Sequence, residues 1–287
     1  MNIHKSVQVN IDHANLKDRI KINSGSFCFN AASASHETKK KILNFKYLKH
    51  SYVPNIDFRS LSNEELKLIS EDFTYSKHNS IKIIKFNFDY LDQLIKLGLH
   101  DCKTHYELLL FQQKLEFESV YYDFMMSFEP YIEDVSSVRF SPLPFRPVGY
   151  LTASTDSRQN NSFVGLHFDT FSQSTFNKRH FAENRLVANI GLETRYLLFI
   201  NLTVADICEM LNIDIDSTNL SILELQHKFF DRFSDYPVFM LSIEPGEAYI
   251  APTENIIHDG STYFKQYCDI AAVILGQISC SPIAKVV

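Results

Sequence analysis

The residue pattern of this chain changes near residue 133, and the change leaves few folds open. From there on, short runs rich in β-branched and aromatic residues alternate with turn residues, which gives about eight strand candidates. They are VSSVRFS, PVGYLTAS, SFVGLHFDTF, NRLVANIG, TRYLLFINLT, YPVFMLSIEPG, EAYIAPT and CDIAAVILGQI. So many short strands in one stretch favour a barrel or a jelly roll over a sheet of alternating strands and helices.

The first half of the chain has the spacing of helices instead. Apolar residues at helical intervals predict helices over 62–73, 89–98 and 104–131, and KIIKFNF at 82–88 predicts one short strand. Two of the helices begin with the Ser/Thr-x-x-Glu pattern of a capping box. We therefore expect an α+β protein in which a mainly helical region, 1–132, packs on a β-rich core, 133–287. A helical insert interrupts that core at about 203–233.

Composition excludes several classes of protein. A net charge of −6 gives no electrostatic reason to expect binding to nucleic acid or to an anionic membrane, and leaves small-molecule partners open. The five cysteines are scattered without a C-x-x-C pair, which argues against a disulfide framework and a zinc–thiolate site. No apolar run is long enough for a signal peptide core or a bilayer span, so a cytoplasmic location is expected. Oligomeric state is left open by these patterns.

One strand candidate carries a notable pair, His167 and Asp169, in VGLHFDTF. In an extended strand, side chains two residues apart point to the same side, so the imidazole and the carboxylate project together. Such a pair is either a local ion pair or part of a metal site.

A second histidine, His258, follows the turn and strand PGEAYIAPT, and it would approach His167 and Asp169 across the mouth of a barrel. Two imidazoles and one carboxylate make the facial triad of non-haem iron enzymes, which leaves three positions on the metal open.

The order of these residues resembles a known family. His167-Phe168-Asp169, followed far downstream by His258, is similar to the HxD…H motif of the Fe(II)/2-oxoglutarate-dependent oxygenases, and RLVANIG resembles the next strand in their aspartyl/asparaginyl hydroxylase-like branch. The resemblance covers about residues 135–280. It implies a double-stranded β-helix, an Fe(II) ion held by His167, Asp169 and His258, and the use of 2-oxoglutarate and dioxygen as cosubstrates.

The resemblance also implies a cation that holds the far carboxylate of 2-oxoglutarate, usually an arginine because its guanidinium group matches a carboxylate. Many members place it shortly after the second histidine, where this chain has Cys268 and Asp269 instead. Arg195 and Arg185, each at the start of a strand, are the candidates here, with Asn189 on the same side as Arg185. The alternative is that Arg195 pairs with a glutamate, Glu193 or Glu247, or that either arginine is exposed.

Two polar loops, 153–162 and 172–184, flank the HxD strand and are expected to rim the barrel mouth. Arg158 and Arg179 in these loops are candidate substrate-binding residues. The sequence thus predicts a dioxygenase that hydroxylates a small molecule, such as an amino acid or a biosynthetic intermediate. Two alternatives stay open: a cupin-like metal enzyme without 2-oxoglutarate, such as an isomerase or a cosubstrate-free oxygenase, and a non-enzymatic jelly-roll binding protein.

Overall fold

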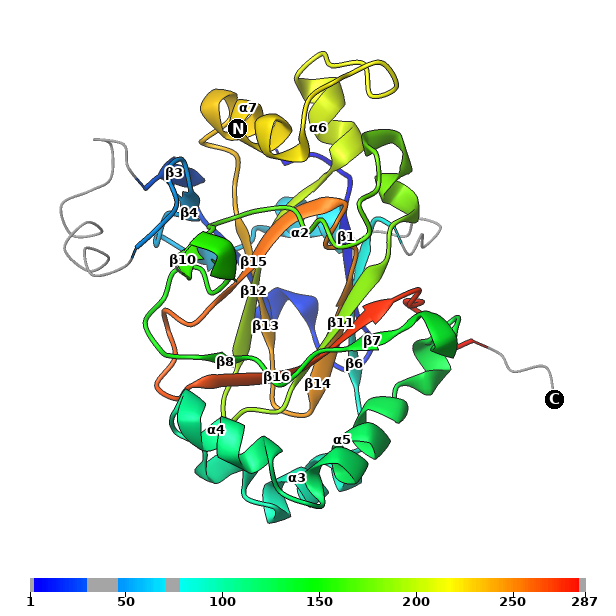
Figure 1. Ribbon diagram of the computed structural model, residues 1–287. Helices are drawn as coiled ribbons and strands as arrows, with labels where there is room; N and C mark the ends of the chain where they lie inside the picture. The colour runs from blue at the N-terminus through cyan, green and yellow to red at the C-terminus, as the bar shows by residue number, and fades with distance from the viewer. Residues whose placement is uncertain (1–2, 30–45, 71–77, 160, 284–287) are drawn as a thin grey trace.

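The computed structural model describes residues 3–29, 46–70, 78–159 and 161–283, and it shows a mixed α+β fold built around two β-sheets (Figure 1). The larger sheet has seven strands. Six follow one another in the order β1 (Gln8–Ile11), β6 (Ser80–Lys85), β14 (Glu247–Ala251), β11 (Asn184–Asn189), β16 (Asp269–Gly276) and β7 (Arg139–Phe140), and β8 (Phe145–Arg146) also pairs with β16. Only the β1–β6 pair is parallel among the described strand pairs of this sheet.

The second sheet has five antiparallel strands and faces the first. Their order is β15 (Ile256–Ser261), β12 (Arg195–Thr203), β13 (Phe239–Ile243), β2 (Ile20–Ile22) and β5 (Arg59–Ser60). Two small hairpins complete the β structure: β3 (Ser26–Cys28) with β4 (Tyr52–Pro54), and β9 (Thr155–Asp156) with β10 (Ser162–Phe163). In the described part of the chain, no ladder of hydrogen bonds joins the two sheets into one closed barrel.

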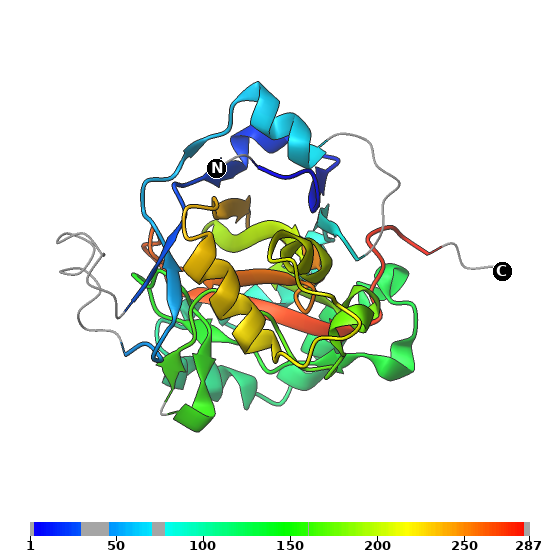
Figure 2. The same ribbon diagram turned by 90° about the horizontal axis from the view of Figure 1, so that it is seen from above.

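Helices cover the outer face of each sheet. The α-helices are α2 (Asn63–Ser70), α3 (Phe88–Lys96), α4 (His105–Gln112), α5 (Phe117–Met126), α6 (Val204–Met210) and α7 (Ile222–Arg232). Single 3-10 turns lie at η1 (Leu16–Asp18), η2 (Leu99–Asp101), η3 (Glu129–Tyr131), η4 (Val135–Ser137) and η5 (Ser157–Gln159), with a longer one at η6 (Phe176–Phe181). Helices α3 to α5 lie at the opposite end of the molecule from α6 and α7, and Figure 2 views the molecule from the α6/α7 end.

The layers follow from the two-residue period of the strands, which turns alternate side chains to opposite faces. On β11, Leu186 and Ala188 face outward into the core under α3 to α5, while Val187 faces inward between the sheets. On β12, Leu198 faces outward into the core under α6 and α7, while Leu197 and its neighbours on β13 face inward. The central strands of both sheets are therefore buried on both faces, and charged side chains inside them require a partner.

The sequence patterns predicted several elements well. Capping boxes are present at Ser62–Glu65 and Thr104–Glu107, and the insert near 203–233 contains α6 and α7. One expectation was wrong in detail, because the helix expected over 104–131 is two helices, α4 and α5. The described part of residues 1–132 also supplies strands, β1 and β6 to one sheet and β2 and β5 to the other. None of the described helices is long and apolar enough to cross a membrane.

Candidate metal centre and arginine-lined cavity

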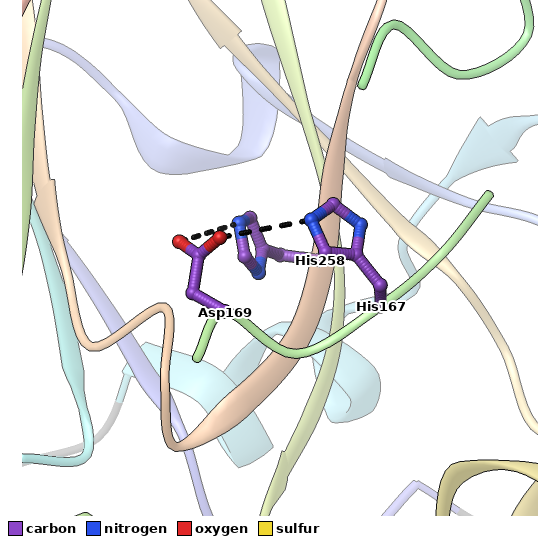
Figure 3. Close-up of side chains that lie close together, drawn as sticks. All are labelled: His167, Asp169 and His258. Carbon is purple, nitrogen blue, oxygen red and sulfur yellow. Dashed lines mark ion pairs between the residues drawn. The ribbon is translucent and has the colours of Figure 1, made fainter. Parts of the chain in front are cut away.

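The three predicted metal ligands come together at one edge of the five-stranded sheet (Figure 3). His258 lies on β15, whereas His167 and Asp169 lie in the loop after β10 and not, as predicted, in a strand of their own. A pair of backbone hydrogen bonds ties that loop to the sheet: His167 N donates to His258 O at 3.0 Å, and His258 N donates to His167 O at 2.8 Å. The two histidines are therefore held side by side by the backbone itself.

The side-chain geometry fits a metal ion. One ligand atom from each of His167, Asp169 and His258 lies within 4.8 Å of the other two, and no other such group of three occurs in the described part of the chain. An Asp169 oxygen lies 3.7 Å from His167 Nε2, and the other lies 3.5 Å from His258 Nε2. Two imidazoles and a carboxylate are the donors of the non-haem Fe(II) facial triad. The prediction that these three side chains meet is confirmed.

The far nitrogen of each imidazole is oriented by the backbone. His167 Nδ1 lies 2.8 Å from Gly165 O, and His258 Nδ1 lies 3.4 Å from Ile256 O. A carbonyl acceptor fixes the proton on Nδ1 and leaves Nε2, the nitrogen nearer Asp169, with a free lone pair for a metal. Gly165 can hold this position because its φ of +76° is in the left-handed region that favours glycine.

Asp169 is held by a buried hydrogen-bond network that no local sequence pattern indicates. Its backbone N donates to Thr253 O at 3.0 Å. Arg179, only 4% exposed, donates from Nη1 to Asp169 O at 2.8 Å and to Glu254 O at 2.5 Å. Glu254 is fully buried and accepts from the backbone N of Ser172 at 2.5 Å. Arg179, predicted to bind substrate, thus uses its guanidinium group to fix the ligand loop instead.

The protonation states also suit metal binding. Burial lowers the pKa of His258 to about 3, so its imidazole is neutral at neutral pH. Burial opposes charge on His167 as well, but its hydrogen bond to Asp169 and the charge of Asp259 raise its pKa overall. Burial alone would raise the pKa of Asp169, yet the charges of Arg185 and His258 hold it well below its usual range. A carboxylate and one neutral imidazole are therefore ready to bind a cation, while the raised pKa of His167 lets protons compete with the metal for its imidazole up to a higher pH than at a free histidine.

An inner cavity of about 220 Å³ opens beside His258, between the two sheets. Three arginines line it: Arg146 from β8, Arg185 from β11 and Arg195 from β12. Tyr249 and the apolar side chains Val187, Val273 and Leu275 also line it. The buried Nε atoms of Arg185 and Arg195 have no hydrogen-bond partner in the structure. Buried donors are normally paired, so these two atoms leave hydrogen-bond donors available to a ligand oxygen in the cavity.

Two of the arginines already contact carboxylates. Arg185 Nη2 lies 2.9 Å from Asp169 Oδ2, and Arg195 is ion-paired with Asp269, which also lies 3.3 Å from Lys265 Nζ. The partner of Arg195 is therefore neither Glu193 nor Glu247. Asp269 occupies the position where the oxygenase pattern would place an arginine.

Asn189 does not face this cavity. Its amide Nδ2 donates to Glu193 O at 3.0 Å and to Ile243 O at 2.8 Å, and its Oδ1 accepts from Gly191 N at 3.1 Å. The side chain is fully buried and its polar atoms are used to hold the turn between β11 and β12. This corrects the expectation that Asn189 contacts a cosubstrate.

A wider outer cavity of about 830 Å³ reaches the metal centre from the surface, and His167 and Asp169 form part of its wall. Arg158 lies on its rim, exposed and 3.1 Å from Asp156 Oδ1. The loop around Arg158 was predicted to rim the site, and it does line this cavity. Arg146, Ser154 and Arg185 line both the outer and the inner cavity, so the two meet next to the ligands.

Two residues of the site escaped sequence analysis. Arg146 lies in the run PLPFRPV, whose prolines argue against a strand, although two of its residues form β8. Asp259 is buried on β15, where it accepts hydrogen bonds from Ser154 N at 3.1 Å and from Ser154 Oγ at 2.8 Å. It also lies 3.8 Å from His167 Nδ1. Its position directly after His258 was the only available signal.

Comparison with known proteins gives a distant structural likeness. No protein family model matches this chain, and no curated protein matches its sequence. Among solved structures, it is similar to the Kdo hydroxylase KdoO, described as a non-heme Fe(II) alphaketoglutarate-dependent dioxygenase, in complex with alphaketoglutarate and Fe(III). The TM-score is 0.40 and the identity 15%, over 70% of this chain and 81% of that one. The same enzyme with succinate and Fe(III) gives a TM-score of 0.39 and 14% identity, over 70% and 80%. A likeness this distant does not carry a function, which has to come from the side chains themselves.

Proposed function

We propose that this protein is an Fe(II)- and 2-oxoglutarate-dependent oxygenase that hydroxylates a small molecule. The observation that carries the proposal is the placement of the His167, Asp169 and His258 group where two cavities meet. The inner cavity is small, enclosed between the sheets and lined by arginines, which suits a dicarboxylate. The outer cavity is open to the surface and several times larger, which suits a separate substrate.

Each residue then has a defined task. His167, Asp169 and His258 would hold the iron, and Arg195, with Arg185 beside it, would hold the far carboxylate of 2-oxoglutarate. Tyr249 supports this placement, because it lines the same cavity and its hydroxyl favours the charged form of Arg195. When bound, Fe(II) supplies the redox chemistry that couples dioxygen to the oxidative decarboxylation of 2-oxoglutarate. The protein orients the reactants, while the apolar wall of the inner cavity keeps water away from the cosubstrate.

The arrangement of the strands agrees with the same proposal. We infer that the two facing sheets are the two halves of a double-stranded β-helix. The core strands β11 to β16 alternate between the sheets, except where β12 and β13 pair within one of them. The ligands then come from the loop before β11 and from β15, both beside the open end of the space between the sheets.

One observation favours a second candidate, a metal enzyme of the same fold that does not use 2-oxoglutarate. Asp269 already pairs with Arg195 and lies within 3.3 Å of Lys265, so a second carboxylate in the inner cavity has to share or displace it. Such an enzyme would bind iron through the same three ligands but would bind no dicarboxylate. The two candidates therefore differ in whether the iron-loaded protein binds 2-oxoglutarate.

An anaerobic titration with Fe(II) and 2-oxoglutarate separates them. The oxygenase predicts a weak visible charge-transfer band at one iron per chain, absent in His167→Ala and weakened in Arg195→Met. His180→Ala is a matched control, because that histidine is exposed and outside the metal group. Iron binding without the band would favour the second candidate, and a folded wild type that binds no iron would refute both.

A further inference from the structure

Arg146 occupies an unusual position in the site. It lies on the short strand β8, opposite Asp269 at the start of β16, and its side chain lines both the inner and the outer cavity. It is partly buried, next to the metal ligands and to two other arginines. The task that Arg195 and Arg185 perform in the proposed function does not require it.

The other arginines of the site are neutralised and Arg146 is not. Arg185 contacts Asp169, Arg195 contacts Asp269, and Arg158 contacts Asp156. No carboxylate of the described residues lies within 4 Å of the Arg146 guanidinium, whose hydrogen bond goes to the carbonyl oxygen of Phe145 at 3.1 Å. Burial and the nearby charge of Arg195 lower the pKa of Arg146, against the weaker opposite effects of Asp259 and Asp269. A partly buried cation without a counter-ion is unfavourable unless a ligand supplies one.

The wall of the outer cavity indicates what else that ligand carries. Seven of its sixteen polar side chains carry a hydroxyl or an amide group, which exchange hydrogen bonds with hydroxyl groups. They are Ser51, Ser154, Thr155, Ser157, Gln159, Thr170 and Gln226. Lys49 on the rim adds a further positive charge, while the two carboxylates in the wall, Asp156 and Asp169, are already paired with arginines.

We infer that the primary substrate is a hydroxylated small molecule with an acidic group, a carboxylate or a phosphate, and that Arg146 binds this group. The inference rests on the proposed function, because it assigns the inner cavity to 2-oxoglutarate and the outer one to the substrate. Arg146 lies where the two cavities meet, so an acid bound there would place the adjoining carbon atoms of the substrate beside the metal centre.

The test uses thermal unfolding of the anaerobic, Fe(II)-loaded full chain with and without 2-oxoglutarate. The probes are inorganic phosphate, gluconate, and glucitol, which matches gluconate except that a CH₂OH group replaces the carboxylate. We expect saturating phosphate or gluconate to raise Tm by about 2–4 °C and glucitol to leave it unchanged. Arg146→Met should abolish the shift. Arg139→Met is the matched control, since Arg139 lies on the neighbouring strand β7, is exposed, and lines neither cavity.

Each outcome supports or overturns the assignment of Arg146 to the acidic group of the substrate. A larger shift with phosphate or with gluconate identifies the acidic group. If neither anion shifts the wild type, or if Arg146→Met keeps the full shift, the inference is wrong. If Arg146→Met leaves the anion shift intact and weakens 2-oxoglutarate binding, Arg146 serves the cosubstrate instead. Should that variant fail to fold, Arg146→Lys replaces it, and the inference then requires the half-saturating anion concentration to rise more than threefold. A missing charge-transfer band refutes the proposed function, whereas the anion shift without 2-oxoglutarate tests Arg146 on its own.

Discussion

Replacing Gly165 with alanine tests how the first metal ligand is held. A Cβ at this position would lie 2.4 Å from Tyr52 O, 3.1 Å from Tyr52 N and 3.2 Å from the Ser51 side chain, so the chain has to move away from β4. That movement breaks the hydrogen bond from Leu166 N to Tyr52 O, which is 2.8 Å long. It also shifts Gly165 O, the acceptor that orients the His167 imidazole.

The size of the effect follows from two contributions. A non-glycine residue at a φ of +76° costs about 1–2 kcal/mol, and the lost hydrogen bond costs about 1 kcal/mol more. We therefore expect Gly165→Ala to lower the free energy of unfolding by about 2–3 kcal/mol. Gly149→Ala is a close control, because its φ is +92° and a Cβ there meets nothing within 4 Å. It should cost only the conformational part, about 1–2 kcal/mol.

Urea unfolding of the metal-free variants measures stability, and anaerobic titration measures iron affinity. Gly165→Ala should bind Fe(II) at least tenfold more weakly, which is the usual effect of disturbing the groups that orient a metal ligand. Gly149→Ala should bind iron as the wild type does. Equal losses of stability in the two variants, or unchanged iron affinity in Gly165→Ala, would refute the argument that close backbone packing at Gly165 positions His167.

Three further outcomes are expected. Arg179→Met removes two charge-assisted hydrogen bonds to backbone carbonyls, so it should lower the free energy of unfolding in urea by about 3 kcal/mol and weaken iron binding. The control Arg158→Met, at an exposed arginine, should change neither property. Equal behaviour of the two variants would contradict the anchoring role of Arg179. Asp269→Asn leaves buried Arg195 without its carboxylate, so it should destabilise the metal-free protein by about 3 kcal/mol. The same variant should bind 2-oxoglutarate more tightly. Weaker binding of 2-oxoglutarate would show that Asp269 does not compete with the cosubstrate. Fe(II) affinity should fall as pH drops through the raised pKa of His167, above 6.5, because the metal has to displace a proton; a flat profile between pH 6 and 8 would exclude this.

The metal group could be predicted because the types and spacing of its residues are visible in short stretches of sequence. His167 and Asp169 are two residues apart, and His258 follows a clear turn, so residue type and order were enough to single them out. The strands after residue 133 were visible for the same reason, since their alternating or continuous apolar runs are local signals. The identity of these elements did not depend on which neighbours they pair with.

Features that depend on distant pairing could not be predicted. Nothing in residues 8–11 shows that they pair with 80–83, a partner that only the folded sheet supplies. The carboxylate that neutralises Arg195 is 74 residues away along the chain, and the arginine left without one, Arg146, lies in a proline-rich segment with no strand pattern. Which buried arginine has a carboxylate partner depends on the whole fold, so it cannot be predicted from the sequence around each residue.

The proposed function requires one Fe(II) ion bound to His167, Asp169 and His258, with 2-oxoglutarate in the adjoining cavity. Crystals grown without oxygen in the presence of Fe(II) and 2-oxoglutarate, with diffraction data collected at the iron absorption edge, would show both. We expect a single strong anomalous peak bonded to these three side chains, with the far carboxylate of 2-oxoglutarate against Arg195. A peak at any other group of residues, or iron at the triad with no 2-oxoglutarate in the inner cavity, would contradict it.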